Sequence, residues 1–425
     1  MHYGTPPSQS EGGIGIQQTY ADARVLLTSF AVNALSPLTL PIATTVKIVI
    51  APDSFKESLS APDAAAAIER GIKQAYPGAH TVCVPMADGG EGTVEAVLAA
   101  TGGKWRTTSV TGALGESLDA SWGWLEDGTA VIEMAAAAGL EQTPPAQRDP
   151  LRASSAGVGQ LIRAALDAGA QRIILGLGGS STNDGGAGLL SALGVRLLDK
   201  HGKDVAPGGA ALADLDRIDT QGLDARLARV QIDIASDVDN PLCGLQGASH
   251  IFGPQKGATA EQVALLDNSL QQFADVCARD LGRDLRNAPG AGAAGGLGFA
   301  AHAFLDARFR PGVDVVAELG KLAEAMEGAT LAFTGEGRMD AQTLRGKTPA
   351  GVARIAHHAG VPVVALAGSL GEGYEDLHAG GITAAFSLAP GPVTLQQACE
   401  HAAQYLCDRA RDVTQLWLAA SKRML

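Results

Sequence analysis

From about Val46 onward, short apolar runs alternate with longer stretches in which apolar residues recur every three or four positions. The short runs predict strands, and the longer stretches predict amphipathic helices. The predicted strands cover residues 47–51, 81–86, 130–134, 172–178, 231–236, 330–335, 361–368 and 382–389. The predicted helices cover residues 63–75, 156–168, 262–281, 313–326 and 348–358. This alternation is typical of an α/β protein in which helices cover parallel sheets.

Six of the predicted strands end in a glycine-rich polar segment. These segments read APDSFKES, PMADGGEG, LGLGGSSTNDGG, ASDVDNPLCG, FTGEGRMD and ALAGSLGEG. The segments that lead into the strands, such as HAGVPV and DAGAQRI, are short and carry little chemistry. Because ligands of open α/β sheets bind outside the carboxyl ends of the strands, this asymmetry predicts a binding site along that edge.

Residues 1–45 lack this periodicity, and we expect them to form a poorly ordered extension. The folded part is then expected to begin near Val46. With 425 residues, the chain is too long for one simple core, and two α/β domains are the natural expectation.

Composition and charge narrow the function classes. The 32 basic and 45 acidic side chains leave a formal charge of −13, which argues against a nucleic-acid-binding surface. No uninterrupted apolar run reaches the roughly 18 residues that a membrane span needs, so no membrane partner is expected. The five cysteines have neither a C-x-x-C pair nor metal-ligand spacing, which favours idle thiols in a reducing cytoplasm.

The segment RIILGLGGSSTNDGGAG is the strongest local signal. A strand runs into Gly178, Gly179 and the hydroxyls that follow, and further glycines open a helix. Backbone amides, hydroxyls and a helix N-terminus can together hold phosphate oxygens. Asp184 is acidic where an anion would bind, so it is expected to hold a metal or take a proton. The structural alternative is a tight turn with Asp184 as a helix N-cap.

Two other segments carry carboxylates after a strand. In ASDVDNPLCG, Asp237, Asp239 and Asn240 are hard oxygen donors suited to Mg²⁺, although a turn before Pro241 would use the same residues. In PMADGGEGT, Asp88 and Glu91 fit either a helix capping box or contact with a substrate. The residues alone leave both alternatives open.

The segment FTGEGRMDAQTLRGKTPAG supplies a basic pair, Arg338 and Lys347, at the start of a helix. Its GKT does not complete a Walker A motif, because Ala341 stands where the earlier glycine is required. GAGAAG at residues 290–295 matches the dinucleotide pattern, but a proline and a polar helix precede it rather than a strand.

Taken in order, several blocks resemble the type I glycerate kinase family. They are IAPDSFKESLSA, PMADGGEGT, GLGGSSTNDGGAG, ASDVDNPLCG, GAAGGLG, FTGEGRMDAQTLRGKTPAGVA and ALAGS. Each block alone is weak evidence for the family, but the ordered set is specific to it and extends from about Val46 to the C-terminal helix. The resemblance implies ATP-dependent phosphorylation of D-glycerate to 2-phosphoglycerate in the cytoplasm, with Mg²⁺.

The resemblance also implies two unequal α/β domains with the active site in the cleft between them. A Rossmann-like parallel-sheet domain would be formed by residues 46–110 and 328–425. The second α/β domain, residues 111–327, would be inserted between these two parts.

Phosphoryl transfer needs mostly positioning and charge neutralisation, which gives the site residues expected roles; Arg338 and Lys347 are assigned to phosphate charge. Lys56 is expected to face the glycerate carboxylate or the transferring phosphate, and Asp237 to hold Mg²⁺ with Asp239 in support. Asp184 is the expected base, although Asp184 and Asp237 could exchange roles. The expected substrate-binding residues are Ser54, Lys56, Asp88, Glu91 and Arg338. The expected nucleotide- and phosphate-binding residues are Gly178, Gly179, Ser180, Ser181, Asn183 and Lys347.

Other functions stay open on the sequence. LGLGGSST is also similar to the phosphate loop of kinases of the galactokinase and homoserine kinase kind, which lack the surrounding blocks. Another small hydroxy-acid kinase and a non-enzymatic hydroxy-acid sensor are the alternatives, and Mg²⁺-dependent nucleotide binding would separate an enzyme from a sensor. A dehydrogenase would need a dinucleotide fingerprint after a strand.

Overall fold

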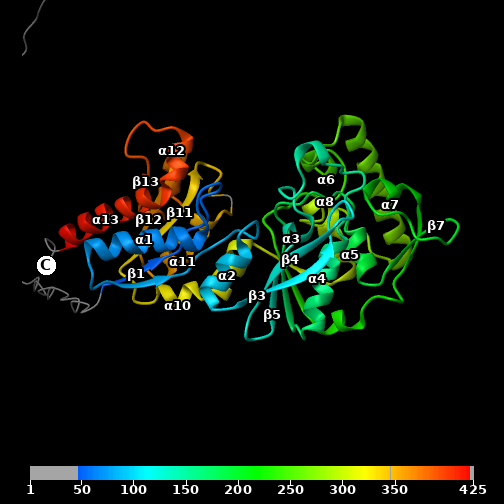
Figure 1. The fold of residues 1–425 in the computed structure, drawn as a ribbon, viewed down its shortest axis with the longest axis horizontal. Coiled ribbons are helices and arrows are strands. Elements are labelled where there is room, and N and C mark those ends of the chain that lie inside the picture. The colour runs from blue at the N-terminus through cyan, green and yellow to red at the C-terminus, as the bar shows by residue number, and fades with distance from the viewer. Residues whose placement is uncertain (1–45, 345, 422–425) are drawn as a thin grey trace, which may run out of the picture. The chain divides into compact units, whose positions relative to one another are not determined.

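The computed structural model describes residues 46–344 and 346–421. The extension expected at residues 1–45 lies outside the described residues. Two large sheets organise the described chain (Figure 1), and the parallel strands within them confirm the predicted α/β class.

The first sheet has five strands, all parallel, in the order β13-β12-β11-β1-β2. Its members are β1 (Lys47–Ile50), β2 (His80–Cys83), β11 (Leu331–Met339), β12 (Val363–Leu370) and β13 (Ala384–Ser387). All five correspond to predicted strands, and they join the two ends of the described chain in one sheet, as predicted.

Helices cover both faces of the five-stranded sheet, which explains why β1 is apolar throughout. Ile48 and Ile50 point into one core with α1 (Ala61–Ala75) and α13 (Ala402–Ser421), and these helices lie side by side (Figure 1). Val49 points into the opposite core, beneath α11 (Thr348–His358). Successive residues of a strand face opposite sides, so a strand buried on both faces needs an apolar residue at every position.

The second sheet has six strands in the order β10-β9-β6-β5-β4-β3. Its members are β3 (Lys104–Thr111), β4 (Ser117–Trp124), β5 (Thr129–Glu133), β6 (Arg172–Gly176), β9 (Gln231–Ala235) and β10 (Arg308–Arg310). The parallel strands β5, β6 and β9 were predicted. The antiparallel strands β3 and β4 were not predicted, because most residues of β3 face solvent and no apolar run marks it.

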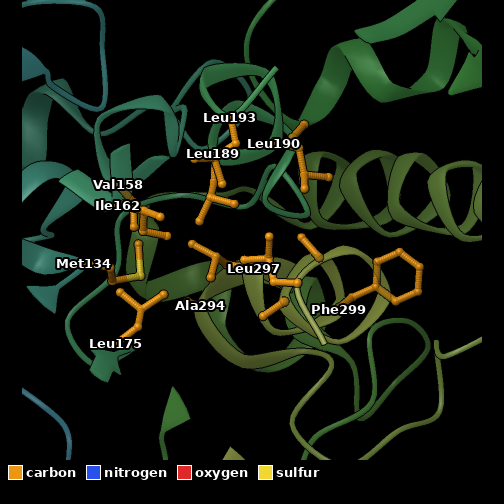
Figure 2. Packing of buried hydrophobic residues seen from close by; sticks show 14 of the residues in the cluster. Met134, Val158, Ile162, Leu175, Leu189, Leu190, Leu193, Ala294, Leu297 and Phe299 are labelled. Atoms are coloured by element: carbon orange, nitrogen blue, oxygen red, sulfur yellow. The ribbon is translucent and has the colours of Figure 1, made fainter. Parts of the chain in front are cut away.

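The parallel strands β5, β6 and β9 of this second sheet are buried on both faces. Ile132 and Leu175 are register partners that point into one core, and Val131 and Ile174 are partners that point into the other. Figure 2 shows the first of these cores, in which Leu175 lies among side chains from several helices. The core on the other face also contains Val49 of the five-stranded sheet, so the two sheets share one hydrophobic cluster.

The remaining helices connect the strands or cover their faces. They are α2 (Thr93–Thr101), α3 (Ala135–Ala138), α4 (Ala156–Asp167), α5 (Ala187–Ala192), α6 (Ala248–Phe252), α7 (Ala260–Leu281), α8 (Ala293–Phe304), α9 (Gly312–Leu319), α10 (Leu322–Met326) and α12 (Leu395–Glu400). The prediction of a single helix at 313–326 was wrong. The helix is interrupted between α9 and α10, where Lys321 adopts a φ of 51°. A small antiparallel pair, β7 (Arg196–Asp199) and β8 (Leu215–Asp219), was not predicted.

The domain limits expected from the sequence, 46–110 with 328–425 and 111–327, stay a prediction. Strand pairing adds one fact, which is that β3 pairs with β4 and so belongs to the six-stranded sheet. Sheet membership therefore changes before Lys104. Across residues 46–344 and 346–421, no helix combines the length and the apolar character needed to cross a membrane.

The packing of α1 against α13 depends on a glycine. A Cβ on Gly71 would lie 2.1 Å from the carbonyl oxygen of Cys407, well inside any real contact. We therefore expect Gly71→Ala to lower the free energy of unfolding by about 1–3 kcal/mol, because the two helices must move apart. Urea denaturation would measure the change. Gly391→Ala is the matched control, because a Cβ there meets nothing within 4 Å; equal stability of both variants would contradict the prediction.

Candidate active site

The strand order of the five-stranded sheet reverses between β1 and β11. The chain moves outward from β1 to β2 on one side and from β11 through β12 to β13 on the other. Such a reversal leaves a crevice at the carboxyl ends of the two central strands, and ligands of open α/β sheets bind there. Asp53 and Ser54 follow β1, and Glu336 lies near the end of β11.

A cavity of about 1100 Å³ lies at these strand ends, and the carboxyl ends of the six-stranded sheet line it as well. The predicted site residues that line it are Ser54, Lys56, Asp88, Glu91, Gly178, Gly179, Asp237, Arg338 and Lys347. Five others do not line it: Ser180, Ser181, Asn183, Asp184 and Asp239. The volume exceeds the range typical of a pocket for one drug-sized ligand, so there is room for two small substrates.

The structure does not support Asp184 as a base. Its side chain is fully buried beneath the glycine-rich loop and accepts four hydrogen bonds. Two come from the backbone N–H and the hydroxyl of Ser155, both at 2.8 Å, and two come from the N–H groups of Gly186 and Gly188. A carboxylate occupied in this way fixes the start of α5 against α4, so the expectation of a catalytic Asp184 is corrected to a structural role.

The second half of the predicted phosphate loop is also turned away from the cavity. Ser181 donates its hydroxyl to the carbonyl of Ala138, and Asn183 donates its amide to Ser249. Ser180 accepts a hydrogen bond of 2.9 Å from Lys256, which also donates to the carbonyl of Thr182. These three residues therefore support the loop from below, and Gly178 and Gly179 are the part that faces the cavity.

The sequence analysis did not identify Lys256 as part of the site. The structure buries this lysine almost completely, with 1% of its surface exposed. Burial lowers the pKa of its ammonium group to about 7, and the carboxylate of Asp184 opposes that change. A lysine in PQKGAT carries no sequence signal that distinguishes it from a surface lysine. Only the fold reveals that it lies beneath the glycine-rich loop.

Asp53 is the most strongly perturbed carboxylate that lines the cavity. Burial and the negative charge of Asp88 raise its pKa to about 7, against the hydrogen bonds that it accepts from Thr348 and Ser54. The hydroxyl of Thr348 donates to one carboxylate oxygen, and the N–H of Ser54 donates to the other at 2.6 Å. A held carboxylate with a pKa near neutrality is suited to accept a proton.

Asp237 lies in the same cavity on the side of the six-stranded sheet. It follows β9, and its carboxylate accepts a 3.2 Å hydrogen bond from the N–H of Gly312. Although the side chain is open to solvent, the cavity walls partly desolvate it and raise its pKa to about 6, with Asp88 adding to the rise. Asp239 is exposed and does not line the cavity.

The cations of the cavity have different partners. Lys347 lies 3.7 Å from Glu336, whose other oxygen accepts a 2.8 Å hydrogen bond from Thr343. Burial raises the pKa of Glu336. Arg338 is largely exposed and lies 3.3 Å from Asp340, and Lys56 is exposed at the cavity wall.

The capping-box interpretation of Asp88 and Glu91 was wrong. Helix α2 begins at Thr93 with Gly92 as its N-cap, and Asp88 instead accepts a hydrogen bond from the N–H of Gly90. Glu133 of the six-stranded sheet, which the sequence reading missed, accepts a 2.7 Å hydrogen bond from the N–H of Val94 in the first turn of α2. Burial raises the pKa of Glu133 to about 7.

Comparison with known proteins identifies the family. The model of the "Glycerate kinase family" matches residues 48–418. The chain belongs to the glycerate kinase family. It is 52% identical to "Glycerate kinase" of Bacillus subtilis (strain 168) and 50% identical to "Glycerate 2-kinase" of Escherichia coli (strain K12). Each comparison covers 87% of this chain and 97% of the relative.

A solved structure agrees with the two-domain α/β layout. The crystal structure of a protein from Salmonella typhimurium LT2, provisionally named glycerate kinase 2, superposes with a TM-score of 0.81 at 49% identity. The similarity covers 89% of this chain and all of the other. Membership of the glycerate kinase family implies ATP as the phosphate donor.

In this glycerate kinase family member, glycines let the backbones of the two sheets approach closely at the cavity. A Cβ on Gly178, after β6, would lie 2.5 Å from the Cα of Gly90, after β2. Gly89 has a φ of 90°, and a Cβ there would lie 2.4 Å from the carbonyl oxygen of Ala235 in β9. These contacts set how closely Asp88 can approach the strand ends of the other sheet.

This contact predicts the effect of one methyl group. Gly178→Ala keeps an allowed backbone conformation but forces the loop at Gly90 away, so we expect kcat/KM for kinase activity to fall by on the order of 10²-fold. Steady-state kinetics would measure the loss. Gly78→Ala, on the surface with only ordinary contacts, is the control; wild-type kinetics in both variants would show that the backbone contact does not set the cavity geometry.

Proposed function

We propose that this protein transfers the γ-phosphoryl group of ATP to the 2-hydroxyl of D-glycerate, which yields 2-phosphoglycerate and ADP. The family and the relative named "Glycerate 2-kinase" support this reaction. The observation that carries the proposal is the cavity at the β1/β11 reversal, which combines carboxylates from both sheets with cations from the five-stranded sheet. Phosphoryl transfer depends mainly on such positioning and on charge neutralisation.

The cations divide between the two substrates. Lys56 and Arg338 are exposed within the cavity lining and would bind the carboxylate of D-glycerate. Lys347 lies at the N-terminus of α11 as its N-cap residue, where the helix dipole adds to its charge. We assign Lys347, together with the backbone of Gly178 and Gly179, to the phosphate oxygens. Asp88 and Glu91 would accept hydrogen bonds from the hydroxyl groups of the substrate.

Asp53 takes the role of base in place of Asp184. Its carboxylate accepts the proton of the 2-hydroxyl as that oxygen forms a bond to the γ-phosphorus. The bond between this phosphorus and the bridging oxygen breaks, and ADP leaves with the electron pair. Thr348 and Ser54 hold the carboxylate in place, and its pKa near 7 matches the task.

Asp237 is the residue that would hold Mg²⁺. Within the described residues, no group of three or more side chains has the geometry of a metal site. Mg²⁺ in phosphoryl-transfer sites is usually held by one or two carboxylates and by the phosphates themselves, and Asp237 with Asp88 nearby fits that pattern. When bound, the ion would neutralise charge on the phosphate oxygens. Asp239, which does not line the cavity, is left out of this role.

A cytoplasmic location belongs to the same proposal. All five cysteines lie within the described residues and all are free thiols. Free thiols are typical of proteins in a reducing compartment.

The decisive experiment is ³¹P NMR after incubation of the protein with MgATP and D-glycerate. We expect ADP together with a new phosphomonoester whose coupling pattern identifies the 2-phosphate. Incubation without D-glycerate is the control. ADP formed equally in that control, or no turnover across a panel of small hydroxy acids, would overturn the kinase assignment in favour of a hydroxy-acid sensor.

The role of Asp53 predicts a pH profile. The base works only when ionised, so kcat/KM should rise with pH through about 7, the raised pKa of Asp53. Asp53→Asn should lower kcat by about 10²–10⁴-fold and leave the affinity for ADP nearly unchanged.

Thr348→Val should displace the same pH limb to higher pH, because it removes a hydrogen bond that lowers the pKa of Asp53. The matched control is Thr414→Val, a buried threonine of α13 whose hydroxyl donates only to Ala410. A profile that is flat between pH 5.5 and 8 in the wild type would exclude Asp53 as the base.

A further inference from the structure

The strand order also fixes the order of the segments along the cavity. From β2, the segments after β1, β11 and β12 follow in turn, and the segment after β13 lies at the outer edge. With neighbouring strands about 4.8 Å apart, β13 lies about 14 Å from β1. The cavity residues after β13 are therefore well separated from Asp53 and the transferring phosphate.

The cavity residues between 387 and 405, which we call the β13 wall, differ in chemistry from the rest of the lining. None of them carries a formal charge at neutral pH. The wall includes Leu388, Val393, Leu395, Ala398 and Tyr405. By contrast, the segments after β1, β2, β9 and β11 each contribute carboxylates or cations. The cavity is thus charged around its centre and apolar at the β13 edge.

Packing within the chain accounts for part of the β13 wall, because Leu388 belongs to the core beneath α1 and α13 and Tyr405 packs against that core, but it does not account for α12. Helix α12 buries none of its residues, and Leu395 at its start is 76% exposed. The helix is nevertheless held by a complete capping box, in which Thr394 and Gln397 exchange side-chain and backbone hydrogen bonds. An ordered helix that presents a leucine to an open cavity is suited to contact an apolar ligand surface.

We propose that the β13 wall binds the adenine ring of the nucleotide. The inference rests on the proposed function, because it takes ATP as the phosphate donor. The phosphates would then run past Gly368 and Ser369, which line the cavity at the carboxyl end of β12, to Lys347 after β11. Adenine is flat and uncharged at neutral pH, so an apolar wall with a tyrosine suits its faces. D-Glycerate is small and anionic, and its place is among the cations.

Cys399 provides a direct test that does not depend on catalysis. Its thiol lines the β13 wall and is half-buried. We expect adenosine and ADP to slow alkylation of Cys399 by iodoacetamide about ten-fold at ten times their Kd, because only the unoccupied fraction reacts. Tripolyphosphate and D-glycerate should leave that rate unchanged. Peptide mass spectrometry reads the modification, with Cys83 and Cys243, which do not line the cavity, as internal comparators.

A substitution gives the second test. Leu395→Gln should weaken the binding of ADP about ten-fold, measured by calorimetry, and leave the binding of tripolyphosphate and the KM for D-glycerate unchanged. Leu416→Gln is the matched control, because Leu416 is 67% exposed on α13 and does not line the cavity. Both side chains are exposed, so neither change should disturb folding.

The outcomes separate this inference from the proposed function. Protection of Cys399 by adenosine supports the β13 wall as the adenine site even if D-glycerate is not phosphorylated. If D-glycerate is phosphorylated but neither adenosine nor ADP protects Cys399, the β13 wall is not the adenine site, and the proposed kinase function still holds. Equal protection by tripolyphosphate places phosphate at the wall and overturns the inference. Loss of self-association in Leu395→Gln with unchanged ADP binding would assign the wall to a second copy of the chain instead.

Discussion

The site depends on a contact between two backbone segments that lie too close together for any side chain to fit between them. Gly89 and Gly90 lie against the carboxyl ends of β6 and β9, so the two sheets approach more closely than packed side chains would permit. That approach brings Asp88 from one sheet near enough to Asp237 on the other for the charge of Asp88 to raise the pKa of Asp237. A wider separation would leave two half-sites, each with only part of the chemistry that phosphoryl transfer needs.

Several carboxylates in this cavity are partly shielded from solvent, and their like charges repel one another. The pKa values of Asp53, Asp237 and Glu336 are all raised, chiefly by burial. Such an arrangement costs folding free energy, and perturbed carboxylates that gather in a cleft are typical of functional sites. A chain with a charge of −13 can still bind anionic substrates because Lys56, Arg338 and Lys347 are placed where they are needed.

The buried network beneath the glycine-rich loop shows why residue type alone can mislead. Asp184 stands next to the loop in sequence, and a carboxylate there suggests chemistry. The chain turns it inward, where Ser155 and two glycine amides satisfy it. Lys256 reaches the underside of the same loop from 74 residues beyond Thr182. The hydrophobic pattern of the sequence predicts neither the inward orientation of Asp184 nor the burial of Lys256, because both depend on how distant segments pack together.

The sequence by itself determined the elements whose hydrophobic pattern is strong. These include all five strands of the first sheet, the α/β class and the glycine-rich loops at the strand ends. It also determined the family, because ordered motifs along a chain need no coordinates. Tertiary structure alone decided that Asp53 lines the cavity while Asp184 is buried, that β3 and β4 extend the second sheet, and that α12 presents Leu395 to the cavity. The physical reason is that hydrophobic periodicity shows which face of a helix or strand is buried. A site depends instead on which ends of different strands and helices come together in space.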